Sequence, residues 1–263
     1  MTTHTAVTHA AHIRTEVARP GPVPWMRLDH LVSRFPWLEA GITWRGEGEP
    51  ADMGLFAAVP VGQALSRWRA LSGDLGFHSI LHSRQVHGAD ILVHDDVPPG
   101  FHLSPDADGH TTDQSDLLIT VSVADCVPVW IVDATSHRVA LLHAGWRGVA
   151  AGILEKGLQL VRRRGSASAD LHVHFGPAIC GCCYEVGPEV HTTLGLDQPP
   201  GNHTVDLRAL LVERAGSAGL PAEQVTASPL CTRCNGDTFF SHRGASTGRQ
   251  IAFVGTRAST LNA

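Results

Sequence analysis

The chain has 263 residues, of which 43% are hydrophobic and 17% charged, a composition typical of folded globular proteins rather than disordered or fibrous ones. The net charge is −5 and no basic stripe occurs, so we expect no nucleic-acid partner. Residues 1–24 lack the apolar core of a signal peptide, and no apolar run reaches the length that spans a bilayer. We therefore expect no membrane partner and a cytoplasmic location.

The N-terminal residues 1–24 are small, polar and proline-terminated, and they predict a flexible arm ahead of a single domain over 25–263. The segment 149–164 predicts a helix, because its apolar residues fall on one face and basic residues close it. Weaker helical patterns cover 62–75, 187–195 and 206–215. Short apolar runs bounded by turn residues predict buried strands at 80–87, 90–94, 117–123, 128–132, 138–144, 171–176 and 250–255.

Strands and helices alternate along most of the chain, which favours an α/β (α+β) fold. We expect a single domain with mixed β-sheets flanked by helices, in a layered α/β/β/α-type sandwich.

Three side chains able to bind a metal lie next to turn-forming residues or at strand edges: His87 in "RQVHGAD", Cys126 in "ADCVP" and His143 in "HAGWRG". Two imidazoles and one thiolate suit zinc, and three protein ligands leave a fourth position open, as catalysis requires. Their spacing is not that of a local ligand motif. A buried free cysteine with two hydrogen-bonded histidines therefore stays an alternative.

The segment "HAGWRG" adds an anion-binding pattern where a predicted strand gives way to a predicted helix. Gly145 and Gly148 let backbone N–H groups approach a ligand near a positive helix terminus. Arg147 could donate two hydrogen bonds to a phosphate or carboxylate. The alternative is a tight turn with a solvated arginine.

The other five cysteines form "CGCC" at 180–183 and "CTRC" at 231–234. These cysteines could assemble a four-thiolate structural zinc site. A zinc ribbon shows two C-x2-C knuckles, however, and we interpret the spacing inside the first cluster as departing from that pattern. We therefore expect these cysteines to pack near one another as thiols.

Six motifs occur in the order seen in the YfiH family: "QVHGAD", "ADCVPV", "HAGWRG", "GPAI…CCYEVG", "LCT…FFSHR" and "TGRQ". Over residues 42–254 the chain resembles this family, which is also described as laccase-like multicopper polyphenol oxidase, purine nucleoside phosphorylase and peptidoglycan editing factor. The family's metal ligands fall on His87, Cys126 and His143. The resemblance implies a YfiH-like catalytic domain that binds Zn²⁺, with copper as the other candidate ion.

For activity, the resemblance implies transferase and hydrolase chemistry: phosphate-dependent cleavage of adenosine, inosine and methylthioadenosine, with adenosine deamination beside it. The partners would be small-molecule purine nucleosides and phosphate. Arginines would hold phosphate against the anomeric carbon while the purine leaves, and we expect Arg45, Arg147 and Arg249 in that role. Gln85 shares a strand face with His87 and is expected to touch substrate.

The sequence departs from the family pattern at several positions. Relatives commonly have Thr where this chain has Val123, so we expect a hydroxyl beside the metal to be lost. The S-L-N segment expected after Arg45 is also absent. The segment "FFSHRG" keeps Arg243 but lacks its usual basic neighbour. These differences bear on substrate contacts rather than on the metal ligands.

Other functions stay open. Cys126 activated by His143 or His87 could be the nucleophile of a metal-free hydrolase acting on peptidoglycan precursors. The degenerate Arg45 motif is also compatible with a protein that binds metal or nucleoside without turnover. Phenol oxidation is the least favoured function, because one His₂Cys triad supplies too few ligands for several coppers. Asp125 is expected to be structural, because neighbours on a strand point to opposite faces.

Overall fold

The computed structural model of the protein describes residues 11–56, 59–162 and 166–258. Its strands form two seven-stranded sheets and one two-stranded sheet. The first sheet has the order β1 (His12–Ile13), β15 (Val225–Ala227), β12 (Leu171–Phe175), β10 (Val127–Asp133), β11 (Val139–Ala144), β8 (Gly109–Thr112) and β6 (Ile91–His94). The second has the order β2 (Val17–Arg19), β3 (Trp25–Arg27), β4 (Leu38–Thr43), β16 (Gln250–Thr256), β9 (Leu117–Val123), β5 (Ser79–Ser83) and β7 (Gly100–Ser104).

The described residues also form a small sheet and several helices. The small sheet pairs β13 (Glu185–Val186) with β14 (His203–Thr204). The helices are α1 (Asp29–Val32), α2 (Val61–Leu75), α3 (Trp146–Ala150), α4 (Ile153–Arg162), α5 (Pro188–Leu194) and α6 (Leu207–Ser217), with 3-10 turns at Ser168–Asp170, Gly181–Cys183 and Ala222–Gln224.

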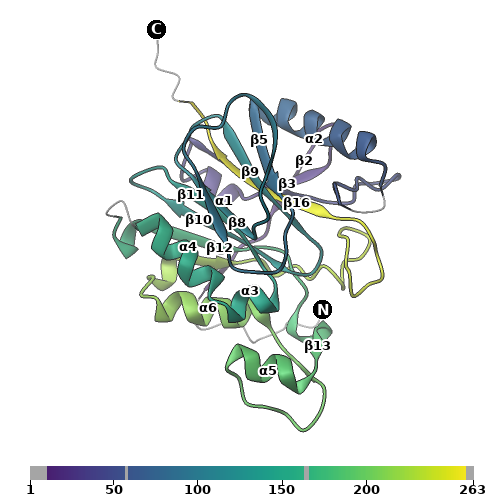
Figure 1. Cartoon of the computed structure of the whole chain (residues 1–263), viewed down its shortest axis with the longest axis vertical. Coiled ribbons are helices and arrows are strands. Elements are labelled where there is room, and N and C mark those ends of the chain that lie inside the picture. Colours follow the sequence, from purple (N-terminus) through teal and green to yellow (C-terminus); the bar gives the residue numbers. More distant parts are fainter. Residues whose placement is uncertain (1–10, 57–58, 163–165, 259–263) are drawn as a thin grey trace.

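The molecule has four layers, as Figure 1 shows: α4 and α6 cover one large sheet, the sheets face each other, and α2 covers the other. Side-chain alternation produces this layering. On β10, Val129 and Ile131 pack with the helices, whereas Trp130 and Val132 pack between the sheets. The predicted mixed α/β fold with two covered sheets is confirmed.

The helix predicted over 149–164 is two helices. Gly152 has a φ of +77° and interrupts the hydrogen-bonded turns between α3 and α4. The strand-to-helix corner at "HAGWRG" therefore leads into a helix of only five residues, Trp146–Ala150. The end of the predicted helix, at 163–164, lies outside the described residues.

The N-terminal segment differs from the flexible arm expected over 1–24. Strand β1 pairs with β15 in the first sheet, and β2 pairs with β3 in the second. Between them Glu16 is buried and accepts hydrogen bonds from His174 Nε2 at 2.9 Å and Ser228 Oγ at 2.8 Å. The segment looked mobile because it has no sustained apolar periodicity, yet backbone pairing and one buried carboxylate hold it. The rest of the predicted arm, residues 1–10, lies outside the described residues.

The strand predicted over 80–87 ends earlier, at Ser83, so His87 lies in a loop. Its apolar pattern continued through Val86, which is half exposed in that loop. The other predicted strands agree with β6, β9, β10, β11, β12 and β16 to within one or two residues. Strand β8 has the polar sequence Gly-His-Thr-Thr and carries no alternating signal that could predict it.

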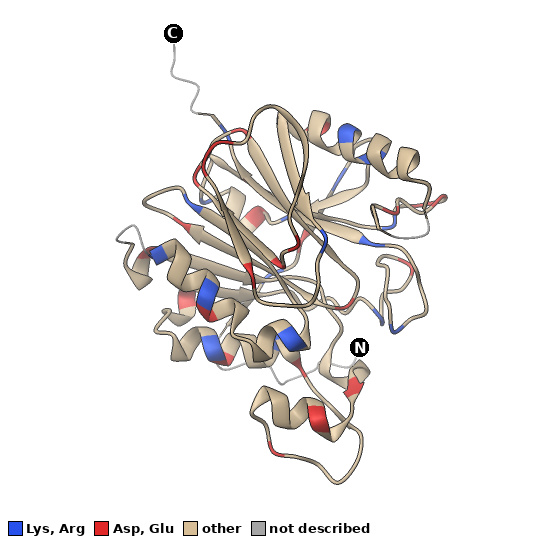
Figure 2. Ribbon diagram, viewed as in Figure 1, with Lys and Arg blue, Asp and Glu red and all other residues tan. Residues whose placement is uncertain are grey.

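Charged residues of both signs are interspersed along the ribbon of the described residues, as Figure 2 shows. In that part of the chain, every helix is too short or too polar to cross a bilayer.

Candidate metal centre and cavity

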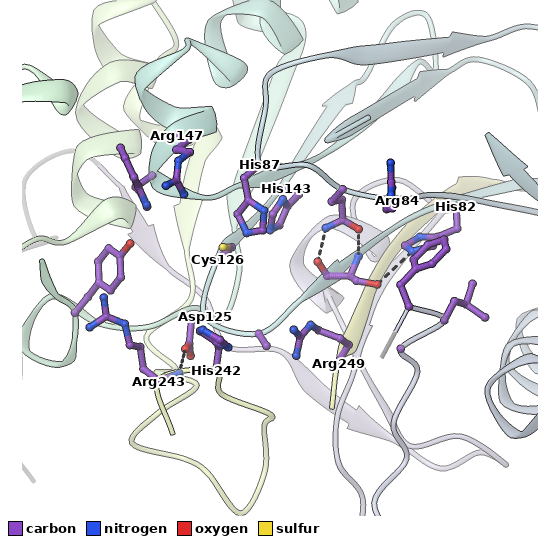
Figure 3. Close-up of a pocket in the computed structure, with 18 residues that line it drawn as sticks. His82, Arg84, His87, Asp125, Cys126, His143, Arg147, His242, Arg243 and Arg249 are labelled. Carbon is purple, nitrogen blue, oxygen red and sulfur yellow. Dashed lines mark hydrogen bonds between the residues drawn. The ribbon is translucent and has the colours of Figure 1, made fainter. Parts of the chain in front are cut away.

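The predicted triad forms where the chain crosses between the two large sheets. His87 lies in the loop from β5 to β6, and Cys126 lies in the turn from β9 to β10; each connection leaves the second sheet and enters the first. His143 is on β11, opposite Pro128 of β10. The ligand atoms of the three residues all lie within 4.8 Å of one another (Figure 3).

A buried carboxylate, Asp108, orients two members of the triad. It accepts hydrogen bonds from His143 Nδ1 at 2.9 Å and from the backbone N–H groups of Val86, His87 and Gly88 at 3.2, 2.9 and 2.7 Å. These bonds hold the loop although His87 has a φ of +60°, which is unusual for a residue with a side chain. Since Asp108 occupies Nδ1 of His143, Nε2 is the nitrogen left for a cation.

The thiol of Cys126 and the ring of His143 shift each other's ionisation. Burial opposes the charged thiolate, but His143 and His87 outweigh it and lower the pKa of Cys126 to about 6. Burial likewise opposes a charged His143, but Cys126 and Asp108 outweigh it and raise the pKa of His143 to about 9. Without a metal, the pair is thus a thiolate beside an imidazolium near neutral pH.

Gly145 lies directly against the triad. A Cβ atom at this position would be 3.1 Å from Cys126 Sγ and 3.1 Å from His87 Cδ2. The glycine therefore leaves room for the three ligands rather than serving only as a turn residue.

The donor set fits a metal ion. One ionisable thiol, two imidazoles and a carboxylate behind one of the imidazoles form a combination that binds zinc in proteins, and copper also accepts these donors. Because three ligands from the described residues converge and face a cavity, one coordination position would be open to a ligand.

The triad forms part of a cavity of about 480 Å³. In Figure 3, Arg147 and Arg243 lie on one side of Cys126, while His82 and Arg249 lie on the other. The cavity is lined by Gly54, Leu55, Phe56, His82, Arg84, Gln85, His87, Ser122, Ala124, Asp125, Cys126, His143, Trp146, Arg147, Tyr184, His242, Arg243 and Arg249. Its size is in the range of pockets for small organic ligands.

The predicted arginines have different surroundings. Arg147 lines the cavity and stacks on Trp146, with its guanidinium carbon 4.3 Å from the ring centre. Arg249 also lines it, although its Nη1 donates to the carbonyls of Thr247 and Gly248. Arg45 is not among the lining residues: it donates to the carbonyl of Gly236 at 3.1 Å and stacks on Phe240.

Gln85 lines the cavity, but its amide binds the backbone of Ser122 through both ends, at 2.5 and 2.9 Å. It joins the His87 loop to β9 rather than offering its polar atoms to a ligand. Val123 points into the core between the sheets and is 1% exposed. A hydroxyl at that position would not face the cavity.

Asp125 holds the wall of the cavity next to Cys126. It has a φ of +87°, and its carboxylate accepts from Thr232 Oγ1 at 2.6 Å and from the backbone N–H of Arg243 at 2.7 Å. Both oxygens are thus engaged with the segment that carries His242 and Arg243 into the cavity.

Sequence reasoning missed the roles of Asp108, His82 and Tyr184. Asp108 sits in a loop 35 residues from His143, and no local spacing links the two. His82 is fully buried on β5, where burial lowers its pKa to about 4. Tyr184 follows "CGCC" directly, but only the fold shows that this loop borders the cavity.

Comparison with known proteins identifies the family of the chain. A family profile described as multi-copper polyphenol oxidoreductase laccase matches residues 62–257. The chain belongs to this family.

Among its relatives, purine nucleoside phosphorylase YlmD of Geobacillus stearothermophilus is 34% identical over 263 residues, covering 89% of this chain and 94% of the relative. Adenosine deaminase RL5, from an unknown prokaryotic organism, is 31% identical over 244 residues, covering 82% and 93%.

Two solved structures have the same fold as this chain. The crystal structure of YlmD from Geobacillus stearothermophilus has a TM-score of 0.81 at 30% identity, covering 92% of this chain and all of the other. That of hypothetical protein YfiH from Bacillus licheniformis has a TM-score of 0.80 at 26% identity, covering 91% and 99%. The resemblance to the YfiH family drawn from the motifs is therefore confirmed.

Proposed function

We propose that the protein is a zinc-dependent purine nucleoside phosphorylase that also deaminates adenosine. The observation that carries the proposal is the convergence of His87, Cys126 and His143 beside a cavity that arginines and aromatic side chains line. The names of two relatives, a purine nucleoside phosphorylase and an adenosine deaminase, supply the two reactions.

Phosphate would bind between Arg147 and Arg243. Both are exposed cavity residues, and His242 lies beside Arg243 in the same wall. Two guanidinium groups can hold phosphate with paired hydrogen bonds and fix it against the sugar. Arg243 thereby takes the place that we expected for Arg45, which lies outside the cavity lining.

The nucleoside would bind with its purine against aromatic side chains. Phe56 lines the cavity yet is 59% exposed, an unusual state for a large apolar side chain. Tyr184 lies next to Arg243, whose guanidinium carbon is 5.0 Å from the centre of the tyrosine ring. Aromatic faces at the rim provide the apolar contact that a planar base requires.

In phosphorolysis, a phosphate oxygen bonds to the anomeric carbon as the bond to the purine breaks, and the purine leaves with that electron pair and gains a proton. In deamination, water replaces the amino group, which leaves as ammonia. A zinc ion held by the triad would supply Lewis-acid chemistry and activate water. Asp108 would keep His143 oriented during either reaction, and the arginines would hold the anion.

The test separates the two reactions by their products. The protein is incubated with adenosine plus phosphate and, in parallel, with adenosine alone. We expect adenine only when phosphate is present, and inosine in both mixtures. Adenine and inosine both absent from the mixtures, with zinc bound to the protein, would contradict the proposal and favour a binding protein without turnover.

A metal-free Cys–His hydrolase is the second candidate, because Cys126 has a pKa of about 6 beside a positively charged His143. Such a pair is an activated nucleophile. The two mechanisms respond differently to inhibitors. If a chelator leaves turnover intact while a thiol-alkylating reagent abolishes it, the hydrolase replaces the metal enzyme.

Phenol oxidation, which the family description names, needs several copper ions that exchange electrons. The described residues form two groups able to hold a metal: this triad, and a cluster made only of cysteines. We therefore favour nucleoside chemistry. Several coppers per chain with matching dioxygen uptake would reverse that choice.

A further inference from the structure

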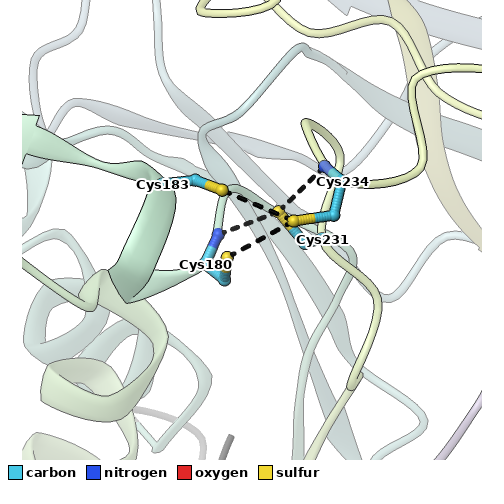
Figure 4. A group of neighbouring side chains, drawn as sticks. All are labelled: Cys180, Cys183, Cys231 and Cys234. Carbon is cyan, nitrogen blue, oxygen red and sulfur yellow. Dashed lines mark hydrogen bonds between the residues drawn. The ribbon is translucent and has the colours of Figure 1, made fainter. Parts of the chain in front are cut away.

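Four cysteines outside the triad meet at one point. Cys180 and Cys183 lie in the loop that follows β12, and Cys231 and Cys234 lie in the loop between β15 and β16. Their sulfur atoms all lie within 4.8 Å of one another, although about fifty residues separate the two pairs (Figure 4). Cys180 and Cys231 are buried, while Cys234 is exposed at the edge of the group.

The spacing of these cysteines corrects our interpretation of the sequence. The pairs that converge are Cys180 with Cys183 and Cys231 with Cys234, so each is a C-x2-C knuckle. The extra cysteine in "CGCC", Cys182, hid the first knuckle. Cys182 touches Cys180 at 3.0 Å but is exposed and is not a member of the group of four.

Two of the sulfur–sulfur distances are close to those of a tetrahedral four-sulfur site. Cys234 Sγ is 3.4 Å from Cys183 Sγ and 4.0 Å from Cys180 Sγ. Four thiolates bound to zinc at about 2.3 Å have tetrahedral edges of about 3.8 Å, which lies between these two distances.

The backbone of both knuckles is directed at one sulfur of the cluster. Cys231 Sγ accepts hydrogen bonds from the backbone N–H groups of Cys180 at 3.3 Å and Cys234 at 3.4 Å. Each knuckle thus contributes one donor to the same sulfur. Two backbone N–H groups directed at one buried sulfur, with three other sulfurs close by, match the surroundings of a metal-bound cysteine.

We propose that Cys180, Cys183, Cys231 and Cys234 bind one structural zinc ion, separate from the ion of the His87–Cys126–His143 triad. All four protein ligands are present, so the site is closed to substrate and serves to join the two loops. On binding, each coordinating thiol would release its proton to solvent.

The position of the cluster gives the ion a structural role for the cavity. Tyr184 follows Cys183 directly, and Arg233 between the second pair donates to the carbonyl of Cys183 at 3.0 Å. Thr232, also within the second knuckle, donates to Asp125 next to Cys126. The ion would therefore fix the cavity wall that carries Tyr184 and Arg243.

The test counts metal in protein purified under reducing conditions without chelator. We expect about two zinc ions per chain in the wild type and in Cys182→Ser, and about one in Cys234→Ser and in Cys126→Ser. Cys234 is exposed, so its replacement spares the core. Cys126→Ser disrupts only the triad, so any zinc that it retains belongs to the four-cysteine site. A failure of the proposed triad function is thereby distinguished from a failure of the four-cysteine site.

A second measurement identifies the ligands of the remaining ion. Cobalt exchanged into Cys126→Ser should show the intense thiolate charge-transfer absorption of a four-sulfur site, and Cys234→Ser combined with Cys126→Ser should abolish it. The proposal is overturned if Cys126→Ser binds no metal, or if Cys234→Ser holds as much as the wild type. Disulfides among the four cysteines in the reduced preparation would also overturn it.

Discussion

Asp108 is the residue on which the geometry of the triad depends. One of its oxygens accepts from both the ring of His143 and the backbone of His87, and the other accepts from Val86 and Gly88. Burial raises its pKa, but the bond to His143 and the backbone donors outweigh that effect and keep the pKa below its ordinary value. The carboxylate therefore stays charged and orients two ligands at once.

Replacing Asp108 with Asn should weaken zinc binding at the triad by about 10- to 100-fold, because an amide offers one acceptor oxygen instead of two. The measurement is competition with a chromophoric chelator. Zinc bound at the triad is taken as the zinc that the protein binds beyond the amount bound by Cys126→Ser. The matched control is Asp106→Asn, whose carboxylate pairs with Arg84 on the surface. Equal affinity in Asp108→Asn and Asp106→Asn would show that Asp108 does not position the ligands.

Arg147 and Arg45 test the placement of phosphate. Arg147→Gln should raise the KM for phosphate about tenfold or more and leave the KM for nucleoside nearly unchanged, because a charged hydrogen bond to the anion is lost. Arg45→Gln should leave both constants unchanged, since Arg45 lies outside the cavity lining. Steady-state phosphorolysis with each substrate varied decides the matter. The opposite ranking of the two variants would return the phosphate site to Arg45.

At the scale of elements, the N-terminal strands extend both large sheets by one edge strand each. β1 adds an edge to the first sheet and β2 adds one to the second, so the segment between them bridges the sandwich. Glu16 in that segment is buried with His174 and Ser228. Its carboxylate ties the segment to β12 and to the residue after β15.

Glu16→Ala should lower the free energy of unfolding by about 2 to 4 kcal/mol, because His174 and Ser228 would keep buried polar atoms without their partner. Chemical denaturation of Glu16→Ala beside Glu47→Ala measures this. Glu47 is exposed, and its variant should match the wild type. If the two variants are equally stable, the N-terminal segment contributes as little as the sequence suggested.

Prediction from sequence succeeded where an element carries its own periodic signal. Strands β9, β10, β11 and β16 and helix α2 have apolar patterns that their burial in the sandwich requires. It failed for β8, which is polar, and for β1 and β2, which are too short to show a period. β8 and β1 are fixed by pairing with strands far along the chain. The break at Gly152 was also missed, because periodicity alone does not register a positive φ.

The residues of the site were likewise predictable only where they carry their own sequence signal. The triad residues were identified from residue type and from motifs that they carry themselves. Asp108 and Arg243 act through contacts with residues 35 and 118 positions away, which only the folded chain reveals. The four-cysteine cluster needed the fold as well, since an extra cysteine masked its spacing.

At the scale of the whole molecule, buried neutral histidines make stability depend on pH. Burial lowers the pKa of His30 to about 3, and that of His82 and His172 to about 4, from an ordinary value of 6.5. The unfolded chain therefore binds more protons than the folded one below pH 6.5. Their stabilising contribution is present above that pH and is lost as the pH falls towards about 4.

Chemical denaturation with chelator present should thus show stability falling between pH 6.5 and pH 4, each pKa unit being worth about 1.4 kcal/mol. His172→Gln should reduce the slope, because one titrating group is removed. A wild-type free energy of unfolding that is the same at both ends of this range would contradict the assignment of these rings as neutral.

In the whole molecule, the triad and its cavity lie where the chain crosses between the two large sheets. Metal-free protein, supplied with adenosine and phosphate, can be titrated with zinc while adenine release is followed. We predict no adenine before zinc is added, a rise that saturates as His87, Cys126 and His143 are filled, and no response in Cys126→Ser. Full adenine release before zinc is added, or the same response in Cys126→Ser, would contradict a catalytic metal at this site.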